Sequence, residues 1–277
     1  MIRYPNAKIN LGLHVTEKRP DGFHNLETVF YPIGLSDILE VVTPNSENGR
    51  GELTFSSSGI PIPGEGNLCS KAFYLLKNDF HDRMNDVHCA AHLHKMVPIG
   101  AGLGGGSSDA AFTLTMLNDI YKLNLNTVQL EAYAARLGSD CPFFIKNKAV
   151  FASGRGEIFE SISLDLSPFF IKLVIPAIHV STPWAYSQIK PKQPAFDLRR
   201  LGEIPVEDWK NTVVNDFEAP VFAKHPELPA IKEELYNEGA LYASMSGSGS
   251  AVFGIFSAMP KHSSNREGSI VWTGKLG

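Results

Sequence analysis

The feature that most constrains this chain is a glycine-rich stretch at residues 98–111, PIGAGLGGGSSDAA. Glycine occupies positions 100, 102, 104, 105 and 106. This density excludes the interior of a packed strand or helix, because each glycine adds backbone freedom and removes a side chain from the core. The apolar spacing that follows predicts a helix from Ser107 to about Tyr121, with Ser107 or Ser108 as its N-cap and Asp109 favouring its first turn.

A glycine-rich turn that enters a helix points several free backbone N–H groups at one place, beside the positive end of the helix dipole. A phosphate group suits that place, although an ordinary turn before a capped helix stays open as the alternative. The P-loop pattern GxxxxGK[ST] is excluded because no lysine follows the glycines. Residues 100–105 satisfy GxGxxG, but a dinucleotide site needs an acid about 20 residues later, where the chain reads Tyr121-Lys122-Leu123-Asn124.

The pattern PxGAGLGGGSS at residues 98–108 resembles the central motif of the GHMP kinases, a family of small-molecule ATP-dependent kinases. LGSDCPFF at 137–144 resembles the family's LGxDxPFF segment, and SGSG at 246–249 resembles the glycine-rich loop that closes its active site. The resemblance implies an α+β fold with a nucleotide-binding half, residues 1–154, and a smaller ferredoxin-like half, residues 155–277. It also implies an active site in the cleft between the two halves.

The N-terminal segment indicates which branch of the GHMP kinases the chain resembles. Residues 5–15 alternate as a half-buried strand, which places Lys8 and Asn10 on one face. Alternation alone assigns them no role, because a strand lysine is usually solvated. The longer segment PNAKINLGLHVTEKRPDGFHNLETVF, residues 5–30, is similar to the branch of the GHMP kinases whose acceptor carries a cytidine diphosphate group. That branch works in the non-mevalonate route to isoprenoid precursors.

The resemblance assigns roles residue by residue. It implies Asp140 as the catalytic base and Lys8 as the partner that stabilises developing negative charge. Local chemistry alone leaves Asp140 as a turn former. The positions assigned to ATP binding are Asn67, Lys95, Pro98, Gly100, Ala101, Gly102, Leu103, Gly104, Gly105, Gly106, Ser107 and Ser108. The positions assigned to substrate binding are Asn10, Phe23, His24, Thr182 and Tyr186.

Within the substrate set, Phe23 and Tyr186 are expected to present planes to the cytosine ring, and His24 is expected to bond to its edge. Each residue also has a local alternative. Phe23 beside a turn is often core filling, Tyr186 can be a half-buried surface aromatic, and Asn67 can simply cap the helix that follows it.

ATP is the expected phosphoryl donor, with Mg²⁺ bridging its β and γ phosphates. No residue is assigned as a metal ligand, and Ser107 is the nearest guess. His88, His92 and His94 suggest zinc at first sight. Strand alternation places Cys89 on the opposite face from them, so a solvated strand face is favoured.

Composition excludes several classes of function. The net charge is −4 and the pI about 6.1, so the chain lacks the basic field of a nucleic-acid binder. No stretch approaches the length of a membrane span, and the N-terminus lacks a signal-peptide layout. Cys69, Cys89 and Cys141 match neither a disulfide framework nor a CxxC zinc pair. We therefore expect a cytoplasmic enzyme, a monomer or homodimer, without nucleic-acid or membrane partners.

Two alternatives stay open. A GHMP kinase for homoserine, mevalonate or a sugar would keep the glycine loop without requiring the Phe23-His24 pair. A noncatalytic RNA-binding protein is the alternative from another class, because the N-terminal fold of these kinases resembles one found in ribosomal proteins. The acidic pI argues against it.

Overall fold

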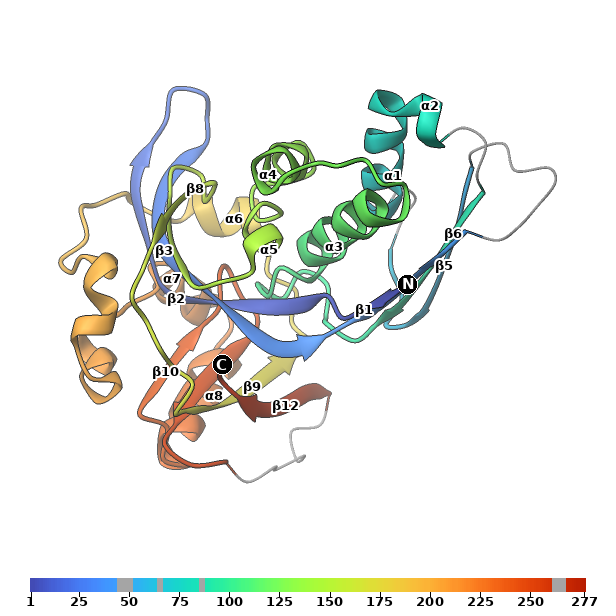
Figure 1. Cartoon of the computed structure of the whole chain (residues 1–277). Helices are drawn as coiled ribbons and strands as arrows, with labels where there is room; N and C mark the ends of the chain where they lie inside the picture. Colours follow the sequence, from blue (N-terminus) through green and yellow to red (C-terminus); the bar gives the residue numbers. More distant parts are fainter. Residues whose placement is uncertain (44–51, 64–66, 85–87, 261–267) are drawn as a thin grey trace. The chain divides into compact units, whose positions relative to one another are not determined.

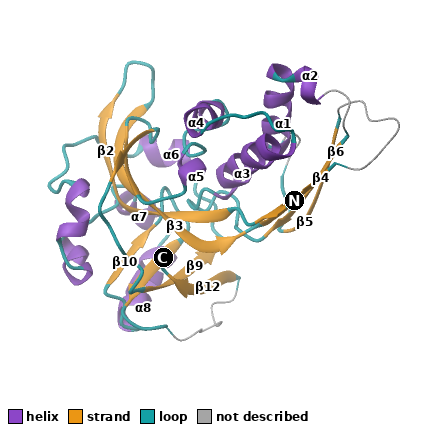
Figure 2. Cartoon of the chain, in the orientation of Figure 1, coloured by secondary structure: helices purple, strands orange, loops and turns teal. Residues whose placement is uncertain are grey.

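The computed structural model describes residues 1–43, 52–63, 67–84, 88–260 and 268–277 (Figure 1). Helices and strands are interspersed along the chain, which confirms the α+β class (Figure 2). The chain forms two compact units, each assembled from separate segments. Unit 1 comprises Met1–Ala7, Leu35–Ile99 and Gly104–Asn147, and unit 2 comprises Lys8–Gly34, Gly100–Leu103 and Lys148–Gly277.

Unit 1 pairs a four-stranded sheet with helices. The strand order is β1 (Ile2–Arg3), β4 (Ile38–Val42), β6 (Cys89–Lys95) and β5 (Leu53–Gly59), with β5 and β6 parallel. The helices are α1 (Leu68–Asp79), α2 (His81–Met84), α3 (Gly105–Ile120), α4 (Thr127–Ala135) and α5 (Phe143–Lys146). Helices α1 and α3 lie on one side of the sheet (Figure 1).

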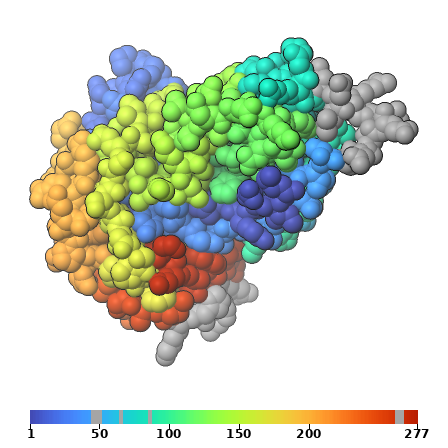
Figure 3. Space-filling view, viewed as in Figure 1, coloured from blue at the N-terminus to red at the C-terminus, as the bar shows by residue number. Residues whose placement is uncertain are grey.

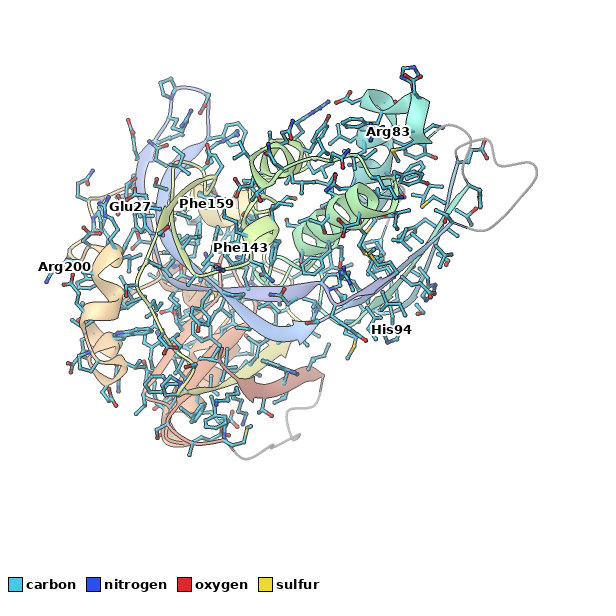
Figure 4. The ribbon with its side chains drawn as sticks, in the orientation of Figure 1. Glu27, Arg83, His94, Phe143, Phe159 and Arg200 are labelled. Carbon is cyan, nitrogen blue, oxygen red and sulfur yellow. The ribbon has the colours of Figure 1, made fainter. Side chains whose placement is uncertain are left out.

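The alternation expected for β6 is confirmed. Cys89 and Leu93 are buried in the core of unit 1, among α1 and α3. His94 projects from the side of the sheet away from those helices (Figure 4). On the same face, the two ring nitrogens of His92 lie 2.8 and 2.9 Å from the hydroxyls of Ser56 and Ser58. These histidines therefore take part in a hydrogen-bonded polar face.

The described part of unit 2 contains two four-stranded sheets. One has the order β2 (Asn6–Lys18), β3 (His24–Ser36), β7 (Val150–Ser153) and β8 (Ile158–Ser161). The other has the order β10 (Tyr242–Met245), β11 (Val252–Phe256), β9 (Phe170–Pro176) and β12 (Ser269–Lys275). The helices are α6 (Thr182–Ser187), α7 (Glu218–Lys224), α8 (Glu227–Asn237) and the short 3₁₀ helices η1 (Leu198–Glu203) and η2 (Val206–Asn211).

The core of unit 2 forms where α8 packs against β10 and β11, with Leu228, Ile231 and Leu235 facing Ala243 and Val252. Burial of apolar area of this kind is the main stabilising contribution to such a unit. The segment that contains η1 and η2, light orange in Figure 3, lies at the surface and exposes charged side chains.

One helix boundary differs from the sequence expectation. Helix α3 begins at Gly105, and its N-cap is Gly104, so the assignment of Ser107 or Ser108 as N-cap was wrong. The glycine-rich stretch therefore contributes the first helical turn as well as the loop. Among the described residues, no helix is both long and apolar enough to cross a lipid bilayer.

Candidate active site

The start of α3 is built for close approach of a ligand to the backbone. Gly104 has a φ of +72°, a left-handed conformation that favours glycine, and as N-cap it offers no side chain to the first-turn amides. The hydroxyl of Ser108 is buried, and no hydrogen-bond partner for it lies among the described residues. Since the first four N–H groups of a helix have no partner within the helix, this end presents donors suited to an anion.

Gly105 packs against β6 and the segment after it. A Cβ atom at this position would lie 2.8 Å from Val97 Cγ1 and 3.1 Å from Lys95 Nζ. Any side chain here would displace these neighbours, so the helix start can pack this closely only with glycine. Gly106 is exposed, and the nearest described atom that a Cβ there would meet is Leu68 Cδ1, at 3.8 Å.

Lys95 lies between two carboxylates beneath the helix start. Its Nζ donates to Asp37 Oδ2 and, at 2.6 Å, to Asp109 Oδ2, and all three side chains are almost fully buried. Asp37 Oδ1 also accepts from the backbone N–H groups of Met96 and Val97. The cluster Asp37–Lys95–Asp109 thus joins the end of β6, the segment before β4 and the first turn of α3.

Burial raises the pKa of Asp109 to about 7, against the opposing attraction of Lys95. Burial alone would lower the pKa of Lys95, but the two carboxylates outweigh it and raise that pKa. Asp109 therefore does more than complement the helix dipole, the role expected from the sequence. Its carboxyl group is part of a buried charged cluster.

Asp140 lies in the turn between α4 and α5 and is half-buried. The hydroxyl of Ser139 donates to Asp140 Oδ1 at 3.4 Å. The next residue, Cys141, is fully buried, and burial raises the pKa of its thiol to about 11 while a hydrogen bond with Ser107 opposes the shift. The turn that carries Asp140 is therefore linked to the first turn of α3.

Asn67 is the N-cap of α1. Its Oδ1 accepts from the backbone N–H of Ser70 at 2.9 Å, so the capping interpretation of this residue is confirmed. Leu68, the first residue of the helix, is the neighbour of Gly106 described above. Pro98 is half-buried at the turn that leads into the glycine loop.

In unit 2, the first half of the glycine loop packs against the SGSG loop. Gly100 and Gly102 have φ angles of +72° and +80°. A Cβ atom on Gly102 would lie 2.0 Å from the carbonyl oxygen of Ser246, a distance that no side chain permits. The Ala101 carbonyl accepts from Ala251 N, and the Leu103 carbonyl accepts from Lys8 N at 2.9 Å. The two glycine-rich motifs that the sequence singled out are therefore in direct contact.

Lys8 and Asn10 lie side by side on β2, as the alternation predicted. Lys8 is 3% exposed, and its Nζ donates to Asn10 Oδ1 at 2.6 Å and to the Gly102 carbonyl at 3.1 Å. The ammonium group also lies 4.9 Å from the centre of the Phe30 ring. The hydroxyl of Ser246 donates to the same Gly102 carbonyl at 2.9 Å. Lys8 is therefore a buried cation within a network, unlike a solvated strand lysine.

The aromatic residues that were expected to contact the cytosine ring of the substrate form two groups. His24 stacks on Tyr186, with ring centroids 5.1 Å apart and planes at 21°. The Phe217 ring packs edge-on against Tyr186 at 4.9 Å. Phe23 is 54% exposed, and the Arg155 guanidinium lies 4.8 Å from its ring centre. Burial lowers the pKa of His24, with Lys18 adding to the effect.

Thr182, the first residue of α6, lies 2.9 Å from Ser248 of the SGSG loop, hydroxyl to hydroxyl. Sequence reasoning missed Ser246 and Ser248 as individual contacts, although it identified their motif. It also missed Asp37, Thr28 and Arg155. Asp37 and Arg155 carry no local signal, whereas Thr28 could have been found from its alternating position in the strand after His24.

Two family descriptions match this sequence. The family described as "GHMP kinases N terminal domain" matches residues 67–148, and the one described as "GHMP kinases C terminal" matches residues 193–267. A 4-diphosphocytidyl-2-C-methyl-D-erythritol kinase from Bacteroides fragilis is 52% identical over 263 residues, which cover 94% of each chain.

Solved structures show the same likeness. A crystal structure of 4-(cytidine 5'-diphospho)-2C-methyl-D-erythritol kinase superposes with a TM-score of 0.82 at 32% identity, covering 100% of this chain and 99% of the other. The mevalonate kinase of Methanococcus jannaschii superposes with a TM-score of 0.70 at 13% identity, covering 100% and 98% of the two chains. The second similarity, at this identity, shows a common fold alone.

Proposed function

Because the chain belongs to the GHMP kinase family, we propose that it transfers the γ-phosphoryl group of ATP to the 2-hydroxyl of 4-diphosphocytidyl-2-C-methyl-D-erythritol. The products are the 2-phosphate and ADP, in the methylerythritol phosphate pathway to isoprenoid precursors. The observation that carries the proposal is the 52% identity, over 94% of both chains, to a kinase named for this acceptor. By contrast, the solved mevalonate and homoserine kinases that share the fold are 13–16% identical to this chain.

Phosphoryl transfer requires that the nucleotide phosphates are held, that their charge is balanced and that the acceptor oxygen is aligned. For the first task we assign the backbone amides of Gly104 to Ser107 at the start of α3, because the Ser108 N–H already donates to the Gly104 carbonyl at 2.9 Å. The left-handed Gly104, which lacks a capping side chain, supports this role. Lys95 would contribute to phosphate binding only indirectly, because its side chain is paired with Asp37 and Asp109.

For proton transfer we assign Asp140 as the general base toward the acceptor hydroxyl. Lys8 would stabilise the negative charge that develops on the acceptor oxygen. The support for Lys8 is its burial and its two fixed acceptors, Asn10 Oδ1 and the Gly102 carbonyl. A buried cation of this kind interacts more strongly with a developing anion than a solvated one does.

For recognition of the cytidine diphosphate group we assign Phe23, His24, Thr182 and Tyr186. Phe23 is exposed and would offer the ring face that is not covered by the Arg155 guanidinium, and the stacked pair His24–Tyr186 offers a second aromatic surface. Binding energy from a base far from the reacting oxygen reduces the entropy cost of aligning the acceptor.

Magnesium is part of the proposal. We propose that the ATP phosphates would hold the ion, with the Ser107 hydroxyl as the nearest protein group. When bound, the ion would neutralise charge on the β and γ phosphates. We further place the enzyme in the cytoplasm, because its three cysteines are all free and ATP is its donor. We also propose that it acts as a monomer or homodimer.

The test is an assay of ADP formation with 4-diphosphocytidyl-2-C-methyl-D-erythritol, homoserine and mevalonate as separate acceptors. We expect turnover with the first alone, and a phosphomonoester at the 2-position by ³¹P NMR. Turnover with homoserine or mevalonate but not with the cytidylyl compound would assign another GHMP activity. Salt-sensitive RNA binding without ATP consumption would favour the noncatalytic alternative.

A further inference from the structure

We propose that Thr28 is a positioning residue for Lys8, acting through the side-chain amide of Asn10. The inference rests on the proposed function, in which Lys8 stabilises charge on the acceptor oxygen. Thr28 itself is fully buried and contacts Asn10 from the neighbouring strand β3.

The first step of the argument is the direction of the hydrogen bond made by Thr28. A hydroxyl group has one proton to donate, and Thr28 Oγ1 gives it to the carbonyl oxygen of Gly12 at 2.5 Å. Gly12 has a φ of +66°, so its backbone departs from regular strand geometry at the point where this carbonyl accepts. Toward any other neighbour, the Thr28 hydroxyl can only accept.

The second step is the orientation of Asn10. Asn10 Nδ2 lies 3.0 Å from Thr28 Oγ1, and because that oxygen is restricted to accepting, the NH₂ end of the amide must face it. The carbonyl end then faces the other way, 2.6 Å from Lys8 Nζ. Lys8 carries only donors, so this is the one orientation of the amide that satisfies both neighbours.

The reversed amide would set a donor against the Lys8 ammonium and would take the Thr28 proton away from the Gly12 carbonyl. Lys8, Asn10 and Thr28 are 3%, 2% and 0% exposed, so water has little access to compensate. Buried donors left unsatisfied destabilise the fold, and more so when they are charged. The Thr28 hydroxyl therefore determines that Lys8 meets an acceptor at this position.

A further contact holds the backbone of Asn10. The hydroxyl of Ser246 accepts from the Asn10 backbone N–H at 3.2 Å and donates its proton to the Gly102 carbonyl at 2.9 Å. The Gly102 carbonyl is the second acceptor of the Lys8 ammonium. The lysine is thus held on one side by the glycine loop and on the other by an amide whose orientation depends on Thr28.

The first experiment replaces Thr28 by valine, which keeps the shape and removes the hydroxyl. We expect kcat to fall between about 10- and 100-fold, the range that misplacement of a reacting group produces, with the KM values for ATP and the cytidylyl acceptor nearly unchanged. Thr28→Ser, which restores the hydroxyl, should recover most of kcat. A Thr28→Val enzyme with wild-type kcat would overturn the proposal.

A double-mutant cycle separates positioning from general destabilisation. In a Lys8→Ala background, Thr28→Val should have little further effect on kcat, because the group that it positions is absent. In an Asn10→Asp background it should also have little effect, since both carboxylate oxygens accept and orientation no longer matters. Equal losses of kcat in all three backgrounds would mean a structural role and would overturn the proposal.

Thr113→Val is the matched control. Thr113 is 2% exposed, and its hydroxyl donates to the Asp109 carbonyl within α3, so this variant also loses one buried hydroxyl bond. It should lower Tm like Thr28→Val but leave kcat unchanged. If Thr28→Val does not fold, Thr28→Cys, a much weaker donor, takes its place in the cycle. A wild-type enzyme without turnover on the cytidylyl acceptor would instead refute the proposed function.

Discussion

His24 and Tyr186 stack on each other, although 162 positions separate them in the sequence, with their planes only 21° from parallel. Residue 24 begins β3 and residue 186 lies in α6, so the stack joins two elements of unit 2. The ring of Phe217 packs edge-on against Tyr186. The stack therefore forms one preassembled aromatic surface, in which the orientation of each ring depends on the other.

We predict that Tyr186→Ala raises the KM for the cytidylyl acceptor by the equivalent of about 1–3 kcal/mol, the range for loss of base stacking on an aromatic ring. Tyr186→Phe, which keeps the ring, should retain most of the affinity. Steady-state kinetics with each substrate varied separately would measure both effects. An unchanged acceptor KM in Tyr186→Ala would remove this residue from the base site.

We predict that Asp140→Asn lowers kcat by about 10²–10⁴-fold, because the acceptor hydroxyl loses its general base. Binding of a nonhydrolysable ATP analogue, measured by calorimetry, should persist, since in the proposed site the start of α3, and not Asp140, binds the phosphates. Asp82→Asn, at an exposed carboxylate in α2, is the control for loss of one negative charge. Full turnover by Asp140→Asn would exclude the carboxylate as the base.

We predict that Gly102→Ala is much more destabilising than Gly239→Ala. Both glycines have a left-handed φ, +80° and +98°, so both variants bear the conformational penalty, which is about 1–2 kcal/mol. Gly102 also faces an obstacle, the Ser246 carbonyl at 2.0 Å, whereas no atom of the described residues lies within 4 Å of a Cβ atom at Gly239. Urea unfolding of the two variants would measure the difference. Equal losses of unfolding free energy in the two variants would show that packing of the glycine loop against the SGSG loop does not contribute to stability.

We predict a pH-dependent effect of Asp109→Asn. The pKa of Asp109 is raised in the folded protein from 3.8 to about 7, so the folded state binds more protons than the unfolded state within that window. The wild type therefore loses stability from this group as the pH rises from about 4 to about 7. Asn cannot titrate, so the stability of Asp109→Asn relative to wild type should increase over the same window.

Urea midpoints at several pH values between 4 and 8 would test this prediction about Asp109. Asp165→Asn is a suitable control, because hydrogen bonds from Ser167 lower the pKa of that exposed carboxyl and move its titration below the window. A constant difference between wild type and Asp109→Asn across the window would mean that Lys95 keeps Asp109 ionised throughout.

Local sequence patterns predicted much of the fold. Alternation placed Lys8 and Asn10 on one strand face and separated Cys89 from the histidines of β6, and both expectations are confirmed. The sequence pattern placed the start of α3 at Ser107 and not at Gly105, because glycine has a low helix propensity. Its helical position is stabilised by close packing on Val97, a tertiary contact that propensity does not contain.

By itself, the sequence determined where the chain turns, which residues share a strand face and which family the motifs indicate, because these depend on neighbours within a few residues. The tertiary structure alone decided which side chain meets which. Thr28 meets Asn10 across 18 positions, Lys95 meets Asp37 across 58 and Ser246 meets Gly102 across 144. Periodicity identifies a face but not its partner, and a hydrogen bond acquires its direction only when donor and acceptor are brought together in the fold.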